Sequence, residues 1–181
     1  FEILKMDAEI SKMESLYLDA NQYLNVVLSA AGAKQFKWAE LYITELKHKI
    51  SADKREDVFK YANAILLYEQ KKYRDALDFL STITPTFWQS QSYIKDLTIK
   101  IYFELGLYEE VEYQIDSYKH YIRKAVNIPK YMRERNELFI RFLQRIIRLR
   151  NNPDEAEIKI LEKKIMDSKT ADKKWLLSKL K

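Results

Sequence analysis

The side chains that most often perform catalysis or bind metals are scarce in this sequence. It has two histidines, His48 and His120, and no cysteine. Neither histidine has a second histidine or a close acidic residue at a metal-ligand spacing. Without cysteine, a thiolate zinc site, a cysteine nucleophile and a disulfide framework are excluded. We therefore expect both histidines at exposed helical positions and predict no metal site.

Motifs for phosphate binding and for acid–base catalysis are also missing. The two glycines, Gly32 and Gly106, stand 74 positions apart and cannot form a glycine-rich phosphate loop. Acidic pairs such as Glu109-Glu110 are explained by helix starts, where negative charge is favoured. The sequence thus predicts no catalytic residue and no cofactor, and a protein that is not an enzyme.

A stripe of arginines is the most prominent charged feature. It consists of Arg133, Arg141, Arg145 and Arg148. The segment from Arg123 to Arg150 holds nine basic and two acidic residues, a local charge of +7 in a chain of net charge +5. Guanidinium groups bind phosphates and carboxylates well, so one hypothesis is a nucleic-acid or other polyanion surface. The alternative, which we favour, is a solvated face paired with acids of the helix that starts at Asp154.

The elements that position these residues are predicted to be helices. Apolar residues recur every three or four positions, which is typical of amphipathic helices. Only two glycines and three prolines occur, too few for the turns of a strand-rich fold. Asp19 is expected to cap one helix, and a helix of about 20 residues should follow Pro129. Asn152-Pro153 predicts the next helix start, with Asn152 as its cap.

The sequence also bounds the compartment. No apolar run approaches the roughly 18 residues needed to cross a bilayer. The absence of cysteine fits a reducing compartment. We therefore expect a cytoplasmic protein. Because the chain begins at Phe1 rather than Met, we further expect a fragment of a longer protein.

Helical hairpins recur along the chain at a regular interval. Phe36 and Tyr73 are 37 residues apart, and Tyr73 and Tyr108 are 35 apart. A period near 34 with two helices in each unit is typical of tetratricopeptide repeats. The stretch from Asp57 to Pro85 resembles such a repeat through the small and bulky residues at its packing positions. These are Ala64, Tyr73, Ala76 and Leu80.

The neighbouring stretches resemble the family less closely, and the resemblance covers about 105 residues in all. The run from Leu24 to Leu180 is similar to the C-terminal part of long uncharacterised bacterial proteins of this kind. The matching phrases are residues 34–40, 102–108 and 174–177. This resemblance implies an all-α fold, a right-handed α-α superhelix. Its expected parts are an N-terminal helix from a preceding repeat (1–18), three repeats (19–126) and a helical extension with a capping helix (127–181).

The resemblance also implies a function, that of a non-catalytic scaffold for protein–protein interaction. In this family the concave groove commonly binds a peptide or a helix of another protein. The residues that would face the groove are Tyr61, Ile65, Tyr68, Tyr93, Lys100 and Phe103. The alternative is that the long helix after Pro129, or an N-terminal portion of the protein that precedes Phe1, fills the groove. The subtype that grips a terminal carboxylate is not supported, because Leu24, Leu28, Tyr61 and Ile65 occupy its positions.

Overall fold

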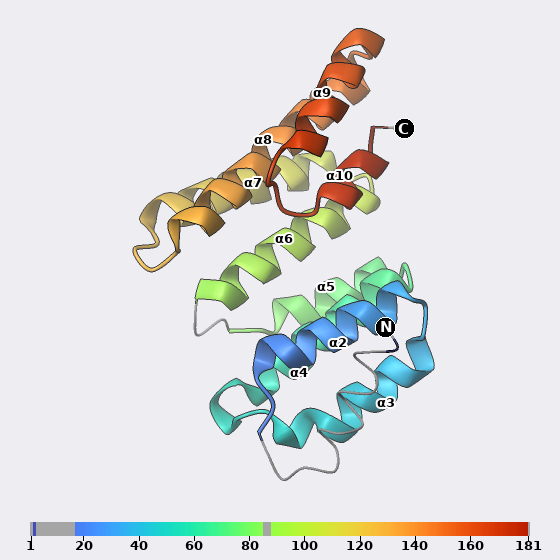
Figure 1. Ribbon diagram of the computed structural model, residues 1–181, viewed down its shortest axis with the longest axis vertical. Helices are drawn as coiled ribbons and strands as arrows, with labels where there is room; N and C mark the ends of the chain where they lie inside the picture. The colour runs from blue at the N-terminus through green and yellow to red at the C-terminus, as the bar shows by residue number, and fades with distance from the viewer. Residues whose placement is uncertain (1, 3–16, 85–87, 181) are drawn as a thin grey trace. The chain divides into compact units, whose positions relative to one another are not determined.

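The computed structural model describes residue 2, residues 17–84 and residues 88–180, and every regular element among them is a helix (Figure 1). The all-α prediction is confirmed at this level. The chain divides into two compact units, residues 1–105 and residues 106–181. The N-terminal helix expected at residues 1–18 lies almost entirely outside the described residues, and Pro85 lies outside them as well.

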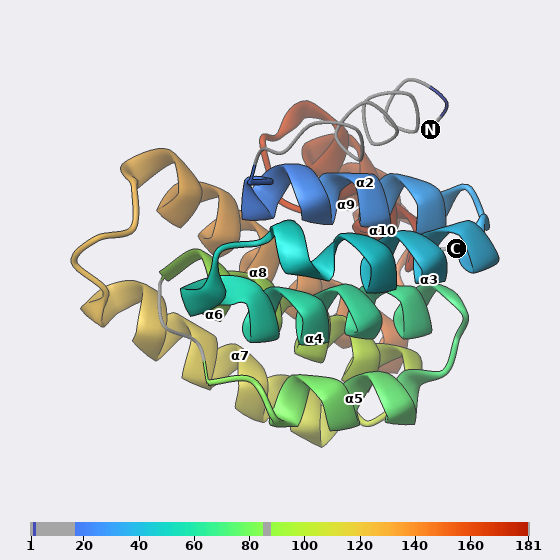
Figure 2. The same ribbon diagram turned by 90° about the horizontal axis from the view of Figure 1, so that it is seen from below.

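The first unit is built from helices that contact their neighbours in chain order. Helix α2 packs against α3 and α4, and α4 packs against α5 and α6. Figure 2 shows α2, α3 and α4 side by side. The elements are α2 (Ala20–Gly32), α3 (Phe36–Leu46), the short 3-10 helix η1 (Lys47–Lys49), α4 (Ala52–Glu69), α5 (Tyr73–Ser81) and α6 (Trp88–Glu104). Helix α4 therefore has both α2 and α6 as neighbours.

The turns inside the hairpins share one backbone feature. Lys34 has a φ of 58° and Lys71 a φ of 62°, each two residues before the second helix of its hairpin. Both turns close alike, because the N–H of Gln35 donates to the carbonyl of Ala30 and that of Lys72 to that of Leu67, at 2.9 Å each. This hydrogen bond is typical of a helix C-terminus that is followed by one residue in the left-handed conformation. Gly106, with φ 73°, holds the same place before Tyr108.

Small residues allow close helix packing in the first unit. Ala64 on α4 and Ala76 on α5 are fully buried. Without a larger side chain between them, two helix backbones can approach to about 8–10 Å. A buried polar contact joins α2 to α3, where the hydroxyl of Tyr23 donates to the carbonyl of Ile43 over 2.7 Å. The ring of Tyr23 lies 5.2 Å from that of Tyr42.

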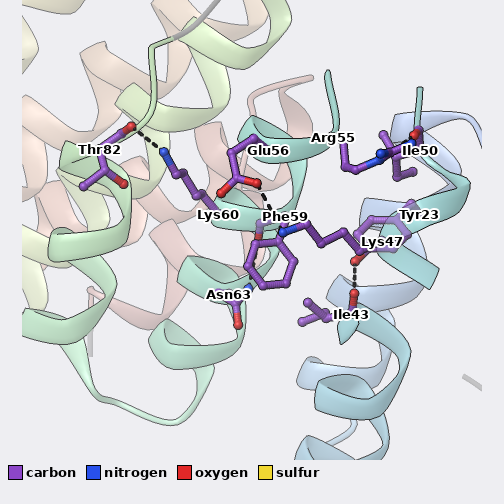
Figure 3. Close-up of polar contacts among 10 residues, drawn as sticks. All are labelled: Tyr23, Ile43, Lys47, Ile50, Arg55, Glu56, Phe59, Lys60, Asn63 and Thr82. Atoms are coloured by element: carbon purple, nitrogen blue, oxygen red, sulfur yellow. Dashed lines mark hydrogen bonds and ion pairs between the residues drawn. The ribbon is translucent and has the colours of Figure 1, made fainter. Parts of the chain in front are cut away.

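Basic side chains fasten the corner between α3 and α4 (Figure 3). The ammonium of Lys47 pairs with Glu56 at 3.2 Å and lies 3.9 Å from the centre of the Phe59 ring. Arg55 on α4 donates to the carbonyls of His48 and Ile50, at 3.1 Å each. These contacts satisfy carbonyl groups left open where the preceding helix ends. Lys47 and Arg55 therefore have structural roles in this unit.

The second unit is arranged around one long helix. It contains α7 (Tyr108–Lys124), α8 (Lys130–Asn151), α9 (Glu155–Asp167) and α10 (Lys173–Ser178). Helix α8 has 22 residues, as the stripe after Pro129 predicts, and it packs against the other three. Two apolar rows, one through Phe142 and Ile146 and one through Phe139 and Leu143, are buried. On α10, Trp175 packs against Phe139 with ring centres 6.1 Å apart.

The helix caps follow the predictions at one site and differ at another. The carboxylate of Asp19 accepts from the N–H groups of Asn21 and Gln22, at 2.8 and 3.3 Å. The prediction that Asn152 caps α9 was wrong. Asp154 is the cap, and its carboxylate accepts from the N–H of Glu157 at 3.0 Å. A carboxylate there also faces the positive end of the helix, which an amide at Asn152 would not match.

Candidate peptide pocket and basic helix

The six groove candidates lie on two neighbouring helices, α4 and α6. The rings of Tyr61 and Tyr93 stack with centres 6.1 Å apart, and the Tyr61 hydroxyl donates to the Tyr93 carbonyl over 3.2 Å. Nearer the other end, the hydroxyl of Tyr68 donates to Glu104 over 3.4 Å. The ammonium of Lys100 lies 5.6 Å from the Tyr68 ring. The structure thus brings these aromatic residues together as cross-helix pairs.

Two of the six candidates are in the interior. Ile65 is 2% exposed and Phe103 is 4% exposed. Both side chains are therefore packed inside the protein and are not open to a ligand. The sequence pattern identifies an apolar helix face, but it does not say whether a ligand or a neighbouring helix covers that face. In this structure only the other four candidates keep partly exposed side chains.

A small apolar pocket lies at the end of the Tyr61–Tyr93 pair. It is formed by side chains of α2, α4 and α6 and by the segment after α5. Its apolar lining comes from Leu24, Val58, Tyr61, Ile83, Tyr93 and Ile94. The enclosed volume is about 20 Å³, close to that of a single water site. A larger side chain would enter only if some of these lining residues moved.

Asp57 gives the pocket its charged group, and Asn21 adds an amide. Burial raises the pKa of the Asp57 carboxyl above its usual 3.8, while nearby Lys60 and the N–H of Thr84 act in the opposite direction. The ammonium of Lys60 is itself held by the carbonyl of Thr82 at 2.9 Å. The pocket therefore combines an apolar interior with one carboxylate at its wall.

The arginine stripe on α8 is largely occupied by contacts within the second unit. Arg133 donates to the carbonyls of Ile122 and Ala125, the latter at 2.8 Å, where α7 ends. Arg145 donates to Glu157 of α9 at 2.9 Å, and Arg148 donates to the same carboxylate oxygen. The hydrogen bond from Arg145 is the main reason why the pKa of Glu157 lies below its usual value.

Three of the four stripe arginines thus stabilise helix ends and the α8–α9 contact. The fourth, Arg141, is exposed and lies at a cavity between α7 and α8. Sequence reasoning identified Arg141 only as part of the stripe. The cavity also draws on Lys119 and Arg123 of α7. That cross-helix grouping depends on how α7 and α8 pair, which residue spacing along one helix does not give.

The histidines are separate from both features. His48 lies in η1, and its backbone carbonyl accepts a hydrogen bond from Arg55 of α4. His120 is exposed on α7. Among the described residues, no group of three or more histidine, aspartate or glutamate side chains is arranged to hold a metal ion.

Among the residues that the structure describes, no helix has the length and apolarity needed to cross a membrane. No protein-family model, curated protein or solved structure matches the chain.

Proposed function

We propose that this protein is a non-catalytic interaction module made of tetratricopeptide-like hairpins that stack as a right-handed superhelix. In this proposal the first unit binds a peptide or helix of another protein at the pocket between α2, α4 and α6. The equivalent turns at Lys34 and Lys71 support the repeat arrangement, because successive hairpins bend the chain in the same way.

The observation that carries the proposal is the pocket at Tyr61 and Tyr93. It is lined by alternate helices of the chain, α2, α4 and α6, and in arrays of this kind such helices form the groove. The two rings offer apolar area, and tyrosine is enriched among residues that dominate binding energy. Their contact with each other is a stacked pair that a ligand side chain can replace with similar packing.

The pocket favours a particular kind of ligand. An apolar side chain matches the lining from Leu24, Val58 and Ile94. A lysine or arginine next to it would pair with Asp57, the carboxylate at the pocket wall. The first unit as a whole carries a net charge of −1 by its sequence, so it does not repel such a ligand. We therefore propose a short segment with an apolar anchor and an adjacent basic residue.

Selection from a random peptide library on the immobilised full chain tests this function. The proposal expects enrichment of peptides with an apolar residue beside lysine or arginine. Enrichment should disappear with Tyr61→Ala as bait and persist with Tyr113→Ala, which removes a tyrosine that is 73% exposed on α7. Peptides enriched equally by all three baits, or no enrichment at all, would count against the pocket as a binding site.

Polyanion binding through the arginine stripe is the second candidate, and it stays a prediction. The contacts of Arg133, Arg145 and Arg148 reduce the charge that the stripe can offer to a phosphate backbone. If nucleic acid did bind there, affinity should fall steeply with rising salt. Glu157→Gln should then increase affinity, because it releases two guanidinium groups.

A further inference from the structure

The second unit contains a cavity between α7 and α8 that the proposed peptide pocket does not involve. Its volume is about 220 Å³. Ile122 of α7 and Ile140 of α8, both buried, contribute its apolar part. Pockets for drug-sized ligands run from about 300 to 1,000 Å³, so this one suits a smaller group.

The polar side chains around the cavity are mainly basic. Lys119 and Arg123 come from one turn of α7, and Arg141 and Gln144 come from one turn of α8. Glu137 is the acidic residue at the cavity, so the lining carries a formal charge of +2. The second unit has a net charge of +6 by its sequence, against −1 for the first, which together give the chain's +5.

The two arginines of the cavity differ from those of the stripe that bind Glu157. Among the described residues, neither Arg123 nor Arg141 makes an ion pair. The ammonium of Lys119 lies 3.3 Å from the carboxylate of Asp116, which precedes it by one turn of α7, and this ion pair is on the surface. Exposed pairs of this kind contribute about 0–1 kcal/mol, so Lys119 can turn to a better partner.

Helix stability explains only part of this arrangement. Arg123 lies in the last turn of α7, where a cation is favoured by the helix dipole. That reason does not apply to Arg141, which lies in the middle of α8. Two guanidinium groups from facing helices, with an ammonium and an amide beside them, make a set of donors whose positive charge Glu137 offsets only in part.

We propose that this cavity binds a phosphomonoester group. A phosphomonoester carries a charge of about −2 near neutral pH and has three acceptor oxygens, which matches the +2 lining. The guanidinium forks of Arg123 and Arg141 fit phosphate oxygens in pairs. A carboxylate would leave one positive charge uncompensated. The cavity volume accommodates the phosphate and the short stem that carries it, either a small molecule or a phosphorylated side chain.

Isothermal titration calorimetry on the full chain tests the proposal with O-phosphoserine, inorganic phosphate and a short phosphoserine peptide as probes. We expect saturable one-to-one binding of at least one probe. The double variant Arg123→Gln/Arg141→Gln should weaken it about tenfold or more, because charged hydrogen bonds are lost. The matched control, Lys159→Gln/Lys163→Gln on exposed positions of α9, removes equal charge and should change affinity less than twofold.

A variant that strengthens binding separates the cavity from general charge effects. Glu137→Gln removes the carboxylate at the cavity and should tighten binding severalfold, an outcome that misfolding cannot produce. Similar affinity for all three probes would identify a small phosphorylated molecule as sufficient, and affinity for the peptide alone a phosphorylated protein. Absence of binding by every probe up to about 10 mM, or equal losses in the two double variants, would overturn the proposal.

Discussion

The hydroxyl of Tyr61 on α4 donates a hydrogen bond to the backbone carbonyl of Tyr93 on α6 over 3.2 Å, and the two rings stack. Tyr61→Phe keeps the ring and removes the hydrogen bond, so unfolding free energy should fall by about 1 kcal/mol. Tyr61→Ala removes both and should cost about 2–3 kcal/mol, less than a fully buried ring. Urea denaturation of both variants measures the difference. Equal stability of the two would show that the ring contributes nothing to the α4–α6 contact.

The left-handed turn residues lead to a prediction of increased stability. Lys71 has a φ of 62°, a conformation that costs a residue with a β-carbon about 1 kcal/mol relative to glycine. Lys71→Gly should therefore stabilise the chain by about 0.5–1 kcal/mol. Lys72→Gly, next to it at φ −86°, should destabilise instead, because glycine only adds freedom to the unfolded chain there.

Gly106 gives the converse test at the equivalent position of another turn, the one between α6 and α7. Its φ is 73°, and a β-carbon placed on it would meet no atom within 4 Å. Gly106→Ala should thus cost about 1 kcal/mol through backbone conformation alone, without a clash. Thermal unfolding of this variant beside Gly32→Ala, where the helix needs no positive φ, measures it. If Gly32→Ala lowered stability as much as Gly106→Ala, the loss at Gly106 could not be attributed to its positive φ.

Two buried tyrosines predict how stability depends on alkaline pH. Burial raises the pKa of Tyr23 and of Tyr42 well above the usual 10.0, and for Tyr23 the neighbouring Tyr42 adds to the rise. A raised pKa means that the unfolded chain loses these protons first. The stabilisation is therefore complete below pH 10.0 and is lost as pH rises above it.

Each of these tyrosines should contribute up to about 1.4 kcal/mol of lost stability per pH unit in that range. Tyr42→Phe should reduce the slope of unfolding free energy against pH above pH 10.0. Tyr113→Phe, at an exposed tyrosine, is the control and should leave the slope as it is. An unchanged slope with Tyr42→Phe would mean that its hydroxyl ionises as easily in the folded protein as in the unfolded one.

Because helix backbones pack closely at Ala76, we expect a larger side chain there to lower the unfolding free energy. Its methyl group is fully buried on α5. Ala76→Leu should destabilise the chain by about 1–3 kcal/mol, because the extra atoms force the α4–α5 hairpin apart. Ala52→Leu, at the exposed start of α4, should change stability by less than about 0.5 kcal/mol. A tolerated Ala76→Leu would contradict the packing expected from the repeat pattern.

Part of this structure follows from residue types alone. Apolar periodicity predicts the helices, and small residues such as Ala64 and Ala76 predict where helices approach closely, because both depend on local spacing. The acids after Asp154 likewise indicate partners for basic residues of the preceding helix, and Glu157 does bind Arg145. These inferences succeed because the residues involved are near one another in sequence or share one helix face.

The rest depends on contacts that local spacing does not contain. Lysine gives no sign of the positive φ at Lys34 and Lys71, which the hairpin geometry imposes. The burial of Ile65 and Phe103 depends on which other elements cover those faces of α4 and α6. The cavity at Arg141 depends on the pairing of α7 with α8. Each of these needs the position of a second helix, which one helix's pattern leaves open.

The most direct test of the account is the affinity of one library-selected peptide, measured by fluorescence anisotropy for the wild type, Tyr61→Ala and Tyr113→Ala. The pocket at Tyr61 and Tyr93 predicts that Tyr61→Ala weakens binding at least about tenfold, the loss typical of a central aromatic contact. Tyr113→Ala should bind within twofold of the wild type. Wild-type affinity in a folded Tyr61→Ala variant would contradict the proposed binding site.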